Sequence, residues 1–139
     1  METTAQLEVT DNENSNNTTD GDHSQSNAAK REGLSLWHKV SLRNVRGYPF
    51  DLSARQMALL LTLYIEDTKQ HSVKSLAAYL DISKPAVCRA LDTLSRHNLA
   101  ERVVDQKDRR NVFIHLTEIG LEFLSRLSKD IVDSVWEIQ

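Results

Sequence analysis

From residue 34 onward, segments with apolar residues at helical spacing alternate with short polar connections. Apolar positions three and four residues apart predict amphipathic helices. The predicted helices span residues 34–46, 53–65, 74–80, 84–97 and 117–139. Two short runs, 99–104 and 112–116, are separated by the polar stretch 105–111 and predict a β-hairpin. The expected fold class is therefore mainly α with one small β-hairpin (α+β).

Two of these helices are separated by only three residues, Asp81-Ile82-Ser83. Ser83 is a favourable N-cap, and Pro85 fits the first turn of a helix, where its missing N–H removes no hydrogen bond. Asn98 stands where a left-handed residue commonly ends a helix. Helices 74–80 and 84–97 therefore predict a helix-turn-helix, and the hairpin that follows predicts its wing.

Spacing also predicts which side of each helix is buried. Ser53 with Gln56 three residues later is a capping-box pattern, and residues 71–73 predict a short strand before the third helix. The apolar face expected for helix 53–65 consists of Met57, Leu60, Leu61, Tyr64 and Ile65. The stripe expected for helix 84–97 consists of Val87, Ala90, Leu91 and Leu94. The opposite side of helix 84–97 is then left exposed.

The last predicted helix is long and carries a broad apolar stripe. Its members are Leu124, Leu127, Ile131 and Ile138, widened by Phe123, Val132, Val135 and Trp136. Helix 34–46, with Leu36, Trp37 and Val40, can cover part of this stripe but leaves its distal end exposed. Because soluble oligomers are most often two-fold dimers, we expect a homodimer formed through these flanking helices.

The exposed side of helix 84–97 and the hairpin tip carry small, polar and basic residues suited to duplex DNA. A helix can present Arg89 to a guanine edge, while a helix N-terminus and the basic hairpin tip can meet phosphates or a minor groove. The candidate DNA-binding residues are Ser72, Lys74, Ser83, Lys84, Pro85, Ala86, Cys88, Arg89, Asp92, Lys107, Arg109 and Arg110.

Two of these residues have alternative interpretations. Asp92 can accept from a cytosine amino group or form an ion pair with Arg89 or Arg96, and we favour the ion pair. Cys88 can act as a redox switch, or it can simply be a small residue on the exposed face. We favour the small residue, because the chain has no second cysteine to resolve an oxidised thiol.

Composition narrows the class of protein. A single cysteine excludes an intrachain disulfide, and the longest apolar run, 57–65, is shorter than the roughly 20 residues of a membrane-spanning helix. The chain lacks G-x-S-x-G and H-E-x-x-H patterns, and its five histidines show no metal-ligand spacing. We therefore expect a cytoplasmic protein that is not an enzyme, needs no metal or cofactor and does not contact membranes.

Charge is unevenly distributed along the chain. Residues 1–29 contain six acidic and no basic residues, which leaves 14 acidic against 17 basic residues in the remainder. Residues 1–30 also lack aromatic side chains, so we expect a disordered acidic tail before a domain at 31–139. The tail either acts as a solubilising extension or competes with DNA for the basic face.

Four segments, in register between about Leu52 and Leu124, resemble the MarR-type winged helix-turn-helix regulators. They read I-S-K-P-A-V-C-R-A-L-D-T-L, N-L-A-E-R, D-Q-K-D-R-R-N and L-T-E-I-G. The resemblance implies that 84–97 is the recognition helix and that Asp108 steadies an Arg109 that enters the minor groove. It also implies homodimers joined through terminal helices, pseudo-palindromic operators, frequent repression, and regulation in many members by small aromatic acids or oxidation.

The chain departs from the family pattern in two places. Asn98 replaces the usual glycine after the recognition helix, and there is length for only one helix after the wing, where the family usually has two.

The favoured function is a sequence-specific, dimeric double-stranded DNA-binding regulator, typically a repressor, with half-sites about 10 base pairs apart. One alternative is a winged helix that docks on an acidic protein partner. Another is a sensor of a small aromatic effector, with a pocket at the dimer interface between the dimerising helices and the winged core. Trp37, Tyr48 and Phe50 would line that pocket, although ordinary core packing also explains them.

Overall fold

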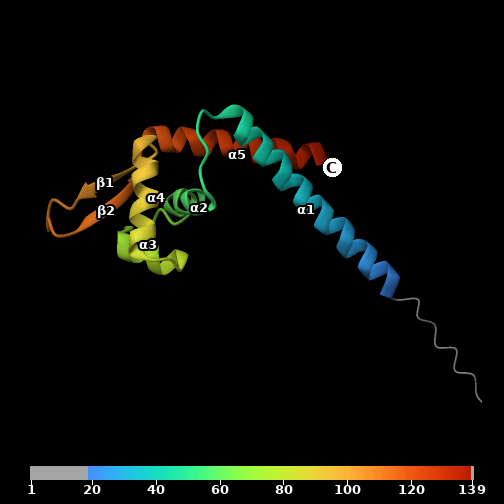
Figure 1. Cartoon of the computed structure of the whole chain (residues 1–139), viewed down its shortest axis with the longest axis horizontal. Helices are drawn as coiled ribbons and strands as arrows, with labels where there is room; N and C mark the ends of the chain where they lie inside the picture. The colour runs from blue at the N-terminus through green and yellow to red at the C-terminus, as the bar shows by residue number, and fades with distance from the viewer. Residues whose placement is uncertain (1–18, 139) are drawn as a thin grey trace, which may run out of the picture. The chain divides into compact units, whose positions relative to one another are not determined.

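A computed structural model describes residues 19–138 of the chain, with side chains from residue 26 onward (Figure 1). The elements in order are α1 (Thr19–Gly47), α2 (Ala54–Ile65), α3 (Val73–Leu80), α4 (Lys84–Arg96), β1 (Ala100–Val104), β2 (Val112–Leu116) and α5 (Glu118–Ile138). The chain divides into two units between Leu34 and Ser35, and the contacts below belong to the second. The predicted fold class, mainly α with one hairpin, is confirmed.

Helix α1 begins earlier than the pattern of apolar residues predicts. We expected disorder up to residue 30, whereas α1 starts at Thr19, so the assignment of residues 19–30 to the tail was wrong. Residues 26–34 are exposed, and this part of the helix includes the strong helix formers Ala28, Ala29 and Lys30. A lack of apolar residues shows that a segment has little to bury, but it does not exclude a helix. Residues 1–18 of the expected tail lie outside the described residues.

The hydrophobic core lies among α2, α3, α4, the hairpin and the first half of α5. Its largest fully buried side chains are Leu59, Leu60, Leu76, Val87, Leu91, Leu94 and Leu99. All four residues of the stripe predicted for α4 are buried, which confirms that prediction. The exposed side of α4 is therefore defined by the packing of its opposite side.

The buried face of α2 is rotated from the predicted one. Leu59, Leu60, Thr62 and Leu63 are buried, whereas Leu61, Tyr64 and Ile65, which we expected inside, are exposed. The run from 57 to 65 is apolar almost all round, so spacing alone does not select a face. Packing against α4 and the other core elements decides it.

Side-chain caps begin three helices, as sequence chemistry requires. In α2 the backbone N–H of Gln56 donates to Ser53 Oγ (3.2 Å), and the N–H of Ser53 donates to Gln56 Oε1 (2.8 Å), so the predicted capping box is confirmed. Ser72 caps α3, and Ser83 caps α4 by accepting from the N–H of Ala86 (3.2 Å). Each cap satisfies a backbone donor that the helix leaves free.

One residue with positive φ follows each helix of the helix-turn-helix. Asn98, with φ 57°, follows α4 as predicted, and Asp81, with φ 52°, ends α3. Asn and Asp tolerate this left-handed conformation better than most residues. The chain can therefore reverse tightly at both points without glycine.

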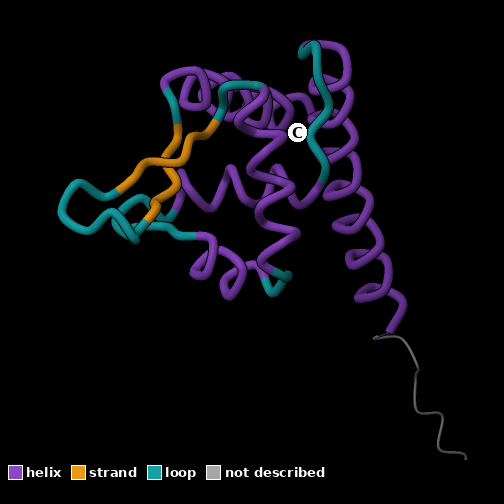
Figure 2. Tube along the Cα trace, turned by 60° about the vertical axis from the view of Figure 1, so that its left-hand side comes forward, coloured by secondary structure: helices purple, strands orange, loops and turns teal. Residues whose placement is uncertain are grey.

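The wing, residues 100–116, is an antiparallel hairpin in which Ala100 faces Leu116 and Val104 faces Val112. Figure 2 shows its two strands and their loop extending away from the helices. The predicted strand at 71–73 consists of a single bridge, in which the N–H of Ile114 donates to the carbonyl of His71 (2.8 Å). This bridge ties the wing to the segment just before α3.

Helix α5 joins the core through a close contact that only glycine permits. The Thr117 hydroxyl accepts from the N–H of Gly120 (2.9 Å), which confirms Thr117 as the predicted cap. A Cβ at Gly120 would lie 2.1 Å from the carbonyl oxygen of Leu99. The start of α5 is thus held directly against the end of the helix-turn-helix.

The second half of α5 packs against residues 35–47 of α1 mainly through polar contacts. Arg43 donates to the carbonyl of Asp130 (2.8 Å) and to Ser134 Oγ (2.9 Å), and it pairs with Glu137. Val40 is buried here, whereas Trp37 and Val45 of α1 are exposed. Of the stripe predicted for α5, Phe123, Leu124 and Leu127 are buried, and three members are exposed instead: Ile131, Val132 and Trp136.

No helix in the described part of the chain is both long enough and apolar enough to span a membrane.

Candidate nucleic-acid interface

The outward side of α4 carries the residues that the sequence places there. Lys84, Pro85, Arg89, Asp92 and Arg96 are exposed, whereas Ala86 and Cys88 are half-buried. Ser83 is exposed at the N-terminus of the helix. This side of α4 therefore presents three basic residues, one acidic residue and the N-terminal end of the helix, which Ser83 caps.

A hollow of about 500 Å³ brings together three segments that are separate in the sequence. Ser72 and Lys74 contribute from the start of α3, Lys84 from the start of α4, and Arg110 from the wing. We call these four residues and the space between them the basic hollow. The positive ends of two helix dipoles and three cationic side chains suit it to phosphate oxygens. Four of the candidate DNA-binding residues therefore share one concave surface.

A second, smaller hollow of about 200 Å³ lies between α4 and the start of α2. Arg89 lines it together with Ser53 and Arg55 of α2. Neither Ser53 nor Arg55 is among the DNA-binding residues predicted from the sequence. The signal was present, because the capping box places Arg55 in the first turn of α2, but nothing in the sequence indicates that this turn lies beside Arg89. The candidate interface therefore extends to α2.

The wing tip has a different ion pair from the expected one. The resemblance implied that Asp108 steadies Arg109, but Asp108 binds Arg110, with Nε at 3.0 Å from Oδ1 and the second nitrogen at 3.1 Å from Oδ2. The hydrogen bond from Arg110 lowers the pKa of Asp108 and raises that of Arg110. Asp108 Oδ1 also accepts from the backbone N–H of Arg110 (3.2 Å), so the local turn itself selects this partner.

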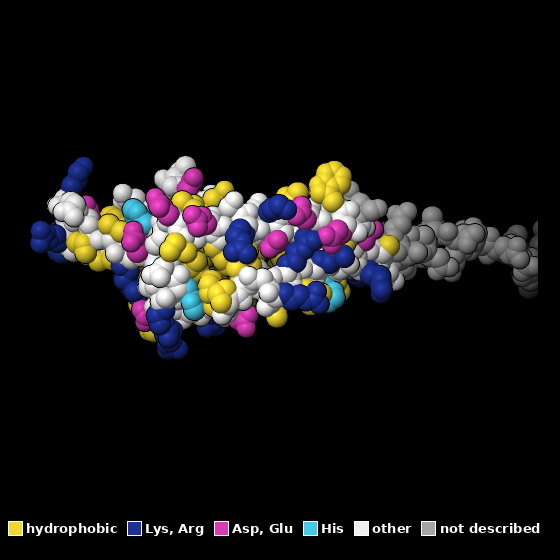
Figure 3. Space-filling model, turned by 90° about the horizontal axis from the view of Figure 1, so that it is seen from above, with side chains coloured by type: hydrophobic (Ala, Val, Ile, Leu, Met, Phe, Trp, Pro, Cys, Tyr) yellow, Lys and Arg dark blue, Asp and Glu magenta, His cyan; other side chains and the backbone are white. Residues whose placement is uncertain are grey.

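Arg109 and Lys107 are exposed on the wing, and neither forms an ion pair with another described residue. Figure 3 shows dark-blue side chains at the end of the molecule where Figure 1 places the wing. These two cations are thus available to an external partner, whereas Arg110 is already paired.

Asp92 forms an ion pair, as we favoured, but with neither of the expected partners. Its Oδ1 lies 3.0 Å from a guanidinium nitrogen of Arg102, on β1. Arg96 instead donates to Thr93 Oγ1 (3.0 Å). Because Arg102 is ten residues away and on a strand, helical spacing could not reveal this contact. The correction leaves Arg89 and Arg96 without a carboxylate partner among the described residues.

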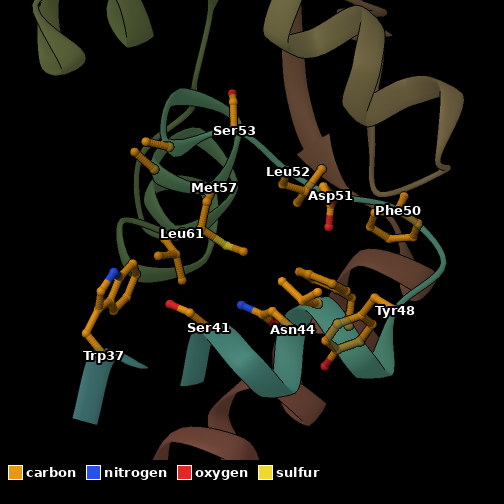
Figure 4. Close-up of a pocket in the computed structure, with 14 residues that line it drawn as sticks. Trp37, Ser41, Asn44, Tyr48, Phe50, Asp51, Leu52, Ser53, Met57 and Leu61 are labelled. Atoms are coloured by element: carbon orange, nitrogen blue, oxygen red, sulfur yellow. The ribbon is translucent and has the colours of Figure 1, made fainter. Parts of the chain in front are cut away.

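Trp37, Tyr48 and Phe50, the three proposed pocket residues, line one cavity of about 420 Å³ (Figure 4). Phe50 also stacks on His97, the residue that caps the C-terminus of α4, with ring centroids 4.2 Å apart. Within the described residues, Tyr48 OH and Asn44 Oδ1 are buried and lack a hydrogen-bond partner. Burial raises the pKa of Tyr48, and the nearby Asp130 carboxylate adds to the shift.

No group of three or more His, Cys, Asp or Glu side chains in the described part of the chain could hold a metal ion. The single cysteine, Cys88, remains a candidate only through its place on α4.

Comparison with known proteins gives matches to the winged helix-turn-helix. A model described as the MarR family matches residues 50–111. YhbI of Bacillus subtilis (strain 168), named an uncharacterized HTH-type transcriptional regulator, is 35% identical over 78 residues, which cover 56% of this chain and 49% of the relative. The chain thus spans about half the length of this curated relative.

Solved structures extend the similarity of fold beyond that segment. S. aureus MepR bound to ethidium bromide has a TM-score of 0.65 at 24% identity, covering 81% of this chain and 77% of that one. A mutant of S. aureus MepR bound to an oligodeoxyribonucleotide has a TM-score of 0.62 at 20% identity, covering 85% and 78%. RV1404 of Mycobacterium tuberculosis has a TM-score of 0.66 at 17% identity, covering 89% and 81%. The resemblance seen in the sequence is confirmed: residues 50–111 match the model described as the MarR family, and the chain has the winged helix-turn-helix fold of the solved structures.

Proposed function

We propose that this chain is a sequence-specific, double-stranded DNA-binding transcriptional regulator that acts as a homodimer, typically as a repressor. The observation that carries the proposal is the basic hollow, where Ser72, Lys74, Lys84 and Arg110 converge from α3, α4 and the wing. It lies beside an α4 whose outward side presents Arg89 and Arg96 without carboxylate partners among the described residues. A surface of this kind suits a DNA backbone, with α4 in the adjacent major groove.

Each group has a distinct role in this proposal. Arg89 reads a base edge from the middle of α4, because a guanidinium can bond both acceptors of guanine. Lys74 and Lys84 bind phosphates in the basic hollow, beside the N-terminal ends of α3 and α4. Arg109 reaches the minor groove from the wing, and Lys107 binds the backbone. Arg55, at the start of α2, adds a further phosphate contact.

Dimerisation supplies the second recognition helix. Trp37 and Val45 on α1 and Val132 and Trp136 on α5 leave an apolar surface exposed in the single chain. Large apolar surfaces of this kind mark interfaces between proteins. A two-fold pair would place its α4 helices in successive major grooves, with half-sites about 10 base pairs apart in a pseudo-palindromic operator.

The test begins by selecting bound fragments from genomic DNA and measuring affinity for the enriched site at several salt concentrations. Arg89→Ala should relax preference at one operator position, at a cost of about 1–3 kcal/mol. Lys107→Ala should weaken all sequences about equally and reduce the salt slope by about one phosphate contact. Glu122→Ala, an exposed change on α5, is the control.

If neither Arg89→Ala nor Lys107→Ala alters DNA affinity, the assignment of the interface is wrong. If the wild-type protein shows no salt-dependent binding to duplex DNA, the chain instead fits the alternative in which the basic face docks on an acidic protein.

The cavity beside α1 supports a second role, the sensing of a small aromatic effector. The lining of this cavity is mainly apolar and includes the aromatic side chains of Trp37, Tyr48, Phe50 and Phe123. A concave, mainly apolar surface of this kind suits a small aromatic ligand. Phe50 lines the cavity and stacks on His97 at the end of α4, so a bound ligand can change the position of the recognition helix.

The charge of the cavity wall favours neutral or cationic aromatic molecules over aromatic acids. Among the described residues that line it, Asp51 alone is charged. Arg126, whose guanidinium carbon lies 4.9 Å from the centroid of the Tyr48 ring, is not among them. An aromatic acid would therefore enter without a cationic partner, at an electrostatic cost.

Binding to the protein alone tests this role. With Trp136→Phe as background, Trp37 is the remaining tryptophan and its fluorescence reports on the cavity. Ethidium, an aromatic cation, should quench it, and benzoate, an aromatic anion, should not. Phe50→Ala should weaken ethidium binding by about three- to tenfold, because it removes an aromatic face from the cavity wall. Preferential binding of benzoate, or binding unaffected by Phe50→Ala, would contradict this assignment.

A further inference from the structure

Asp92 is the only acidic residue of α4, and it stands on the side of the helix proposed to face DNA. Arg89 lies three residues before it and Arg96 four residues after it. These are the spacings at which oppositely charged side chains pair on a helix surface. Neither pair forms, because the Asp92 carboxylate is bound to Arg102 instead.

Arg102 is well placed to hold this carboxylate. It lies on β1, where it is paired in register with the buried Ile114. Its guanidinium is 3.0 Å from Asp92 Oδ1 and also donates, at 3.5 Å, to the carbonyl of Cys88, one helical turn earlier. The Arg102 side chain is 37% exposed against 62% for that of Asp92, so the cation approaches from the protein side and the carboxylate faces solvent.

We propose that Arg102 is the internal counter-ion of Asp92, and that by holding this carboxylate it keeps Arg89 and Arg96 unpaired for DNA. The inference rests on the proposed DNA-binding function. Arg102 is a positioning residue here, because it acts through Asp92 and does not touch DNA itself.

Removal of Arg102 has two consequences, and both weaken DNA binding. Asp92 becomes free to capture Arg89 or Arg96 at helical spacing, which withdraws a cation from the interface. Its unneutralised charge also faces the phosphates that α4 approaches, and like charges brought together at an interface are unfavourable. An exposed ion pair contributes little to folding stability, so the effect is expected in DNA affinity and not in the melting temperature.

A double-mutant cycle tests the proposal, with affinity measured by fluorescence anisotropy on the operator fragment selected from genomic DNA. Arg102→Ala should weaken binding about tenfold at moderate ionic strength. Asp92→Asn alone should not lower affinity, because it removes a carboxylate from the side of α4 that approaches phosphates. The double variant should return to within about threefold of the wild type, because the carboxylate that Arg102 restrains is gone.

Two further variants distinguish the effect of the position of Arg102 beside Asp92 from the effect of its positive charge alone. Arg46→Ala removes one positive charge from the exposed end of α1 and leaves the Asp92 pair intact, so it should change affinity by less than about twofold. Arg102→Lys keeps a cation on β1 and should retain most of the affinity that Arg102→Ala loses. A loss with Arg46→Ala as large as that with Arg102→Ala would overturn the proposal, since net charge alone would then account for the effect.

Three other results would overturn it. If Arg102 binds phosphate directly, Arg102→Ala lowers the salt slope by about 0.9, and Asp92→Asn does not restore affinity. If Asp92 reads a cytosine, Asp92→Asn changes the preferred operator sequence. If Arg102 only stabilises the wing, Arg102→Ala lowers the melting temperature and affinity together, and the second substitution rescues neither. Absence of DNA binding by the wild-type protein would refute the proposed function itself, before any variant is compared.

Discussion

Helices α4 and α5 carry similar apolar stripes, but the two stripes have different surroundings. In α4 every member, from Val87 to Leu94, is buried by α2, α3 and the hairpin. In α5 the stripe is buried up to Leu127, and beyond it Val132 is 51% and Trp136 71% exposed. The winged core therefore buries its own apolar residues. The arm, which we define as residues 35–47 of α1 with 128–138 of α5, leaves large apolar side chains exposed.

The same contrast applies to what holds each region together. The core is a continuous apolar cluster whose side chains are close to fully buried. The arm depends more on Arg43 and its polar partners on α5, with Ser134 buried where an apolar residue would stand in a core helix. Substitutions in the core should therefore act on folding, whereas those in the arm should act on assembly.

The largest expected effect is a core truncation. Leu91→Ala removes a fully buried side chain of α4 and should lower the free energy of unfolding by about 2–5 kcal/mol. Val132→Ala, on the exposed part of the α5 stripe, should change it by about 0.5 kcal/mol or less at low protein concentration. Urea unfolding followed by circular dichroism measures both. Equal losses would mean that the two stripes do not differ.

The next effect concerns assembly. Trp136→Ala should weaken self-association about 30-fold, because exposed tryptophans within an apolar patch are typical centres of binding energy. Sedimentation at a series of concentrations measures the change, and DNA affinity at low concentration should fall with it. Glu122→Ala on the core half of α5 is the matched control. Unchanged self-association would place the dimer interface elsewhere.

Within the arm, a smaller effect distinguishes a cation with three polar contacts from a cation with one. Arg43→Met should cost about 1–2 kcal/mol of stability, because it removes the hydrogen bonds from Arg43 to Ser134 Oγ and to the Asp130 carbonyl. Lys39→Met, which removes only a 3.5 Å contact to Glu137, should cost less than about 0.5 kcal/mol. Urea unfolding again provides the measurement, and the two variants should bind DNA alike if both remain dimeric. Equal costs would contradict this account of the arm.

The smallest expected effect concerns the pKa values of two carboxylates, one in the wing and one in the arm. The pKa of Asp108 in the wing is lowered by its hydrogen bond from Arg110, and that of Asp133 in the arm by its hydrogen bond from Lys129. A lowered pKa in the folded state means that each pair stabilises the fold above the ordinary value of 3.8 and that this contribution is lost as pH falls through the lowered pKa.

Carbon NMR titration of the two side chains should give both pKa values below 3.8. Arg110→Ala should raise the pKa of Asp108 toward its ordinary value, and Lys129→Ala should raise that of Asp133, each without affecting the other carboxylate. A titration of Asp108 that is insensitive to Arg110→Ala would show that the wing pair does not persist in solution. Both pairs are exposed, so little change in overall stability accompanies these shifts.

Much of the site could be predicted from the sequence because its parts are local. Ser83 and Lys84 at the start of α4, Arg89 on its outward side, and basic residues on the hairpin tip follow from cap, stripe and turn signals. The partners of the interface residues in the folded protein could not be predicted in this way. Asp92 was paired by helical spacing with Arg89 or Arg96, but the actual cation comes from β1, ten residues away. Arg55 was missed because its neighbour in space, Arg89, lies on another helix.

The sequence by itself determined the order and type of the elements from α2 onward, the caps at Ser53, Ser83 and Thr117, and the reversal at Asn98. These features depend on residues within a few positions of one another, where backbone sterics and short hydrogen bonds decide. Only the tertiary structure decided which face of α2 is buried, where the α5 stripe leaves the core, and that Arg102 holds Asp92. Spacing defines an apolar or charged face, but the element packed against it, often distant in the chain, selects its orientation and its partners.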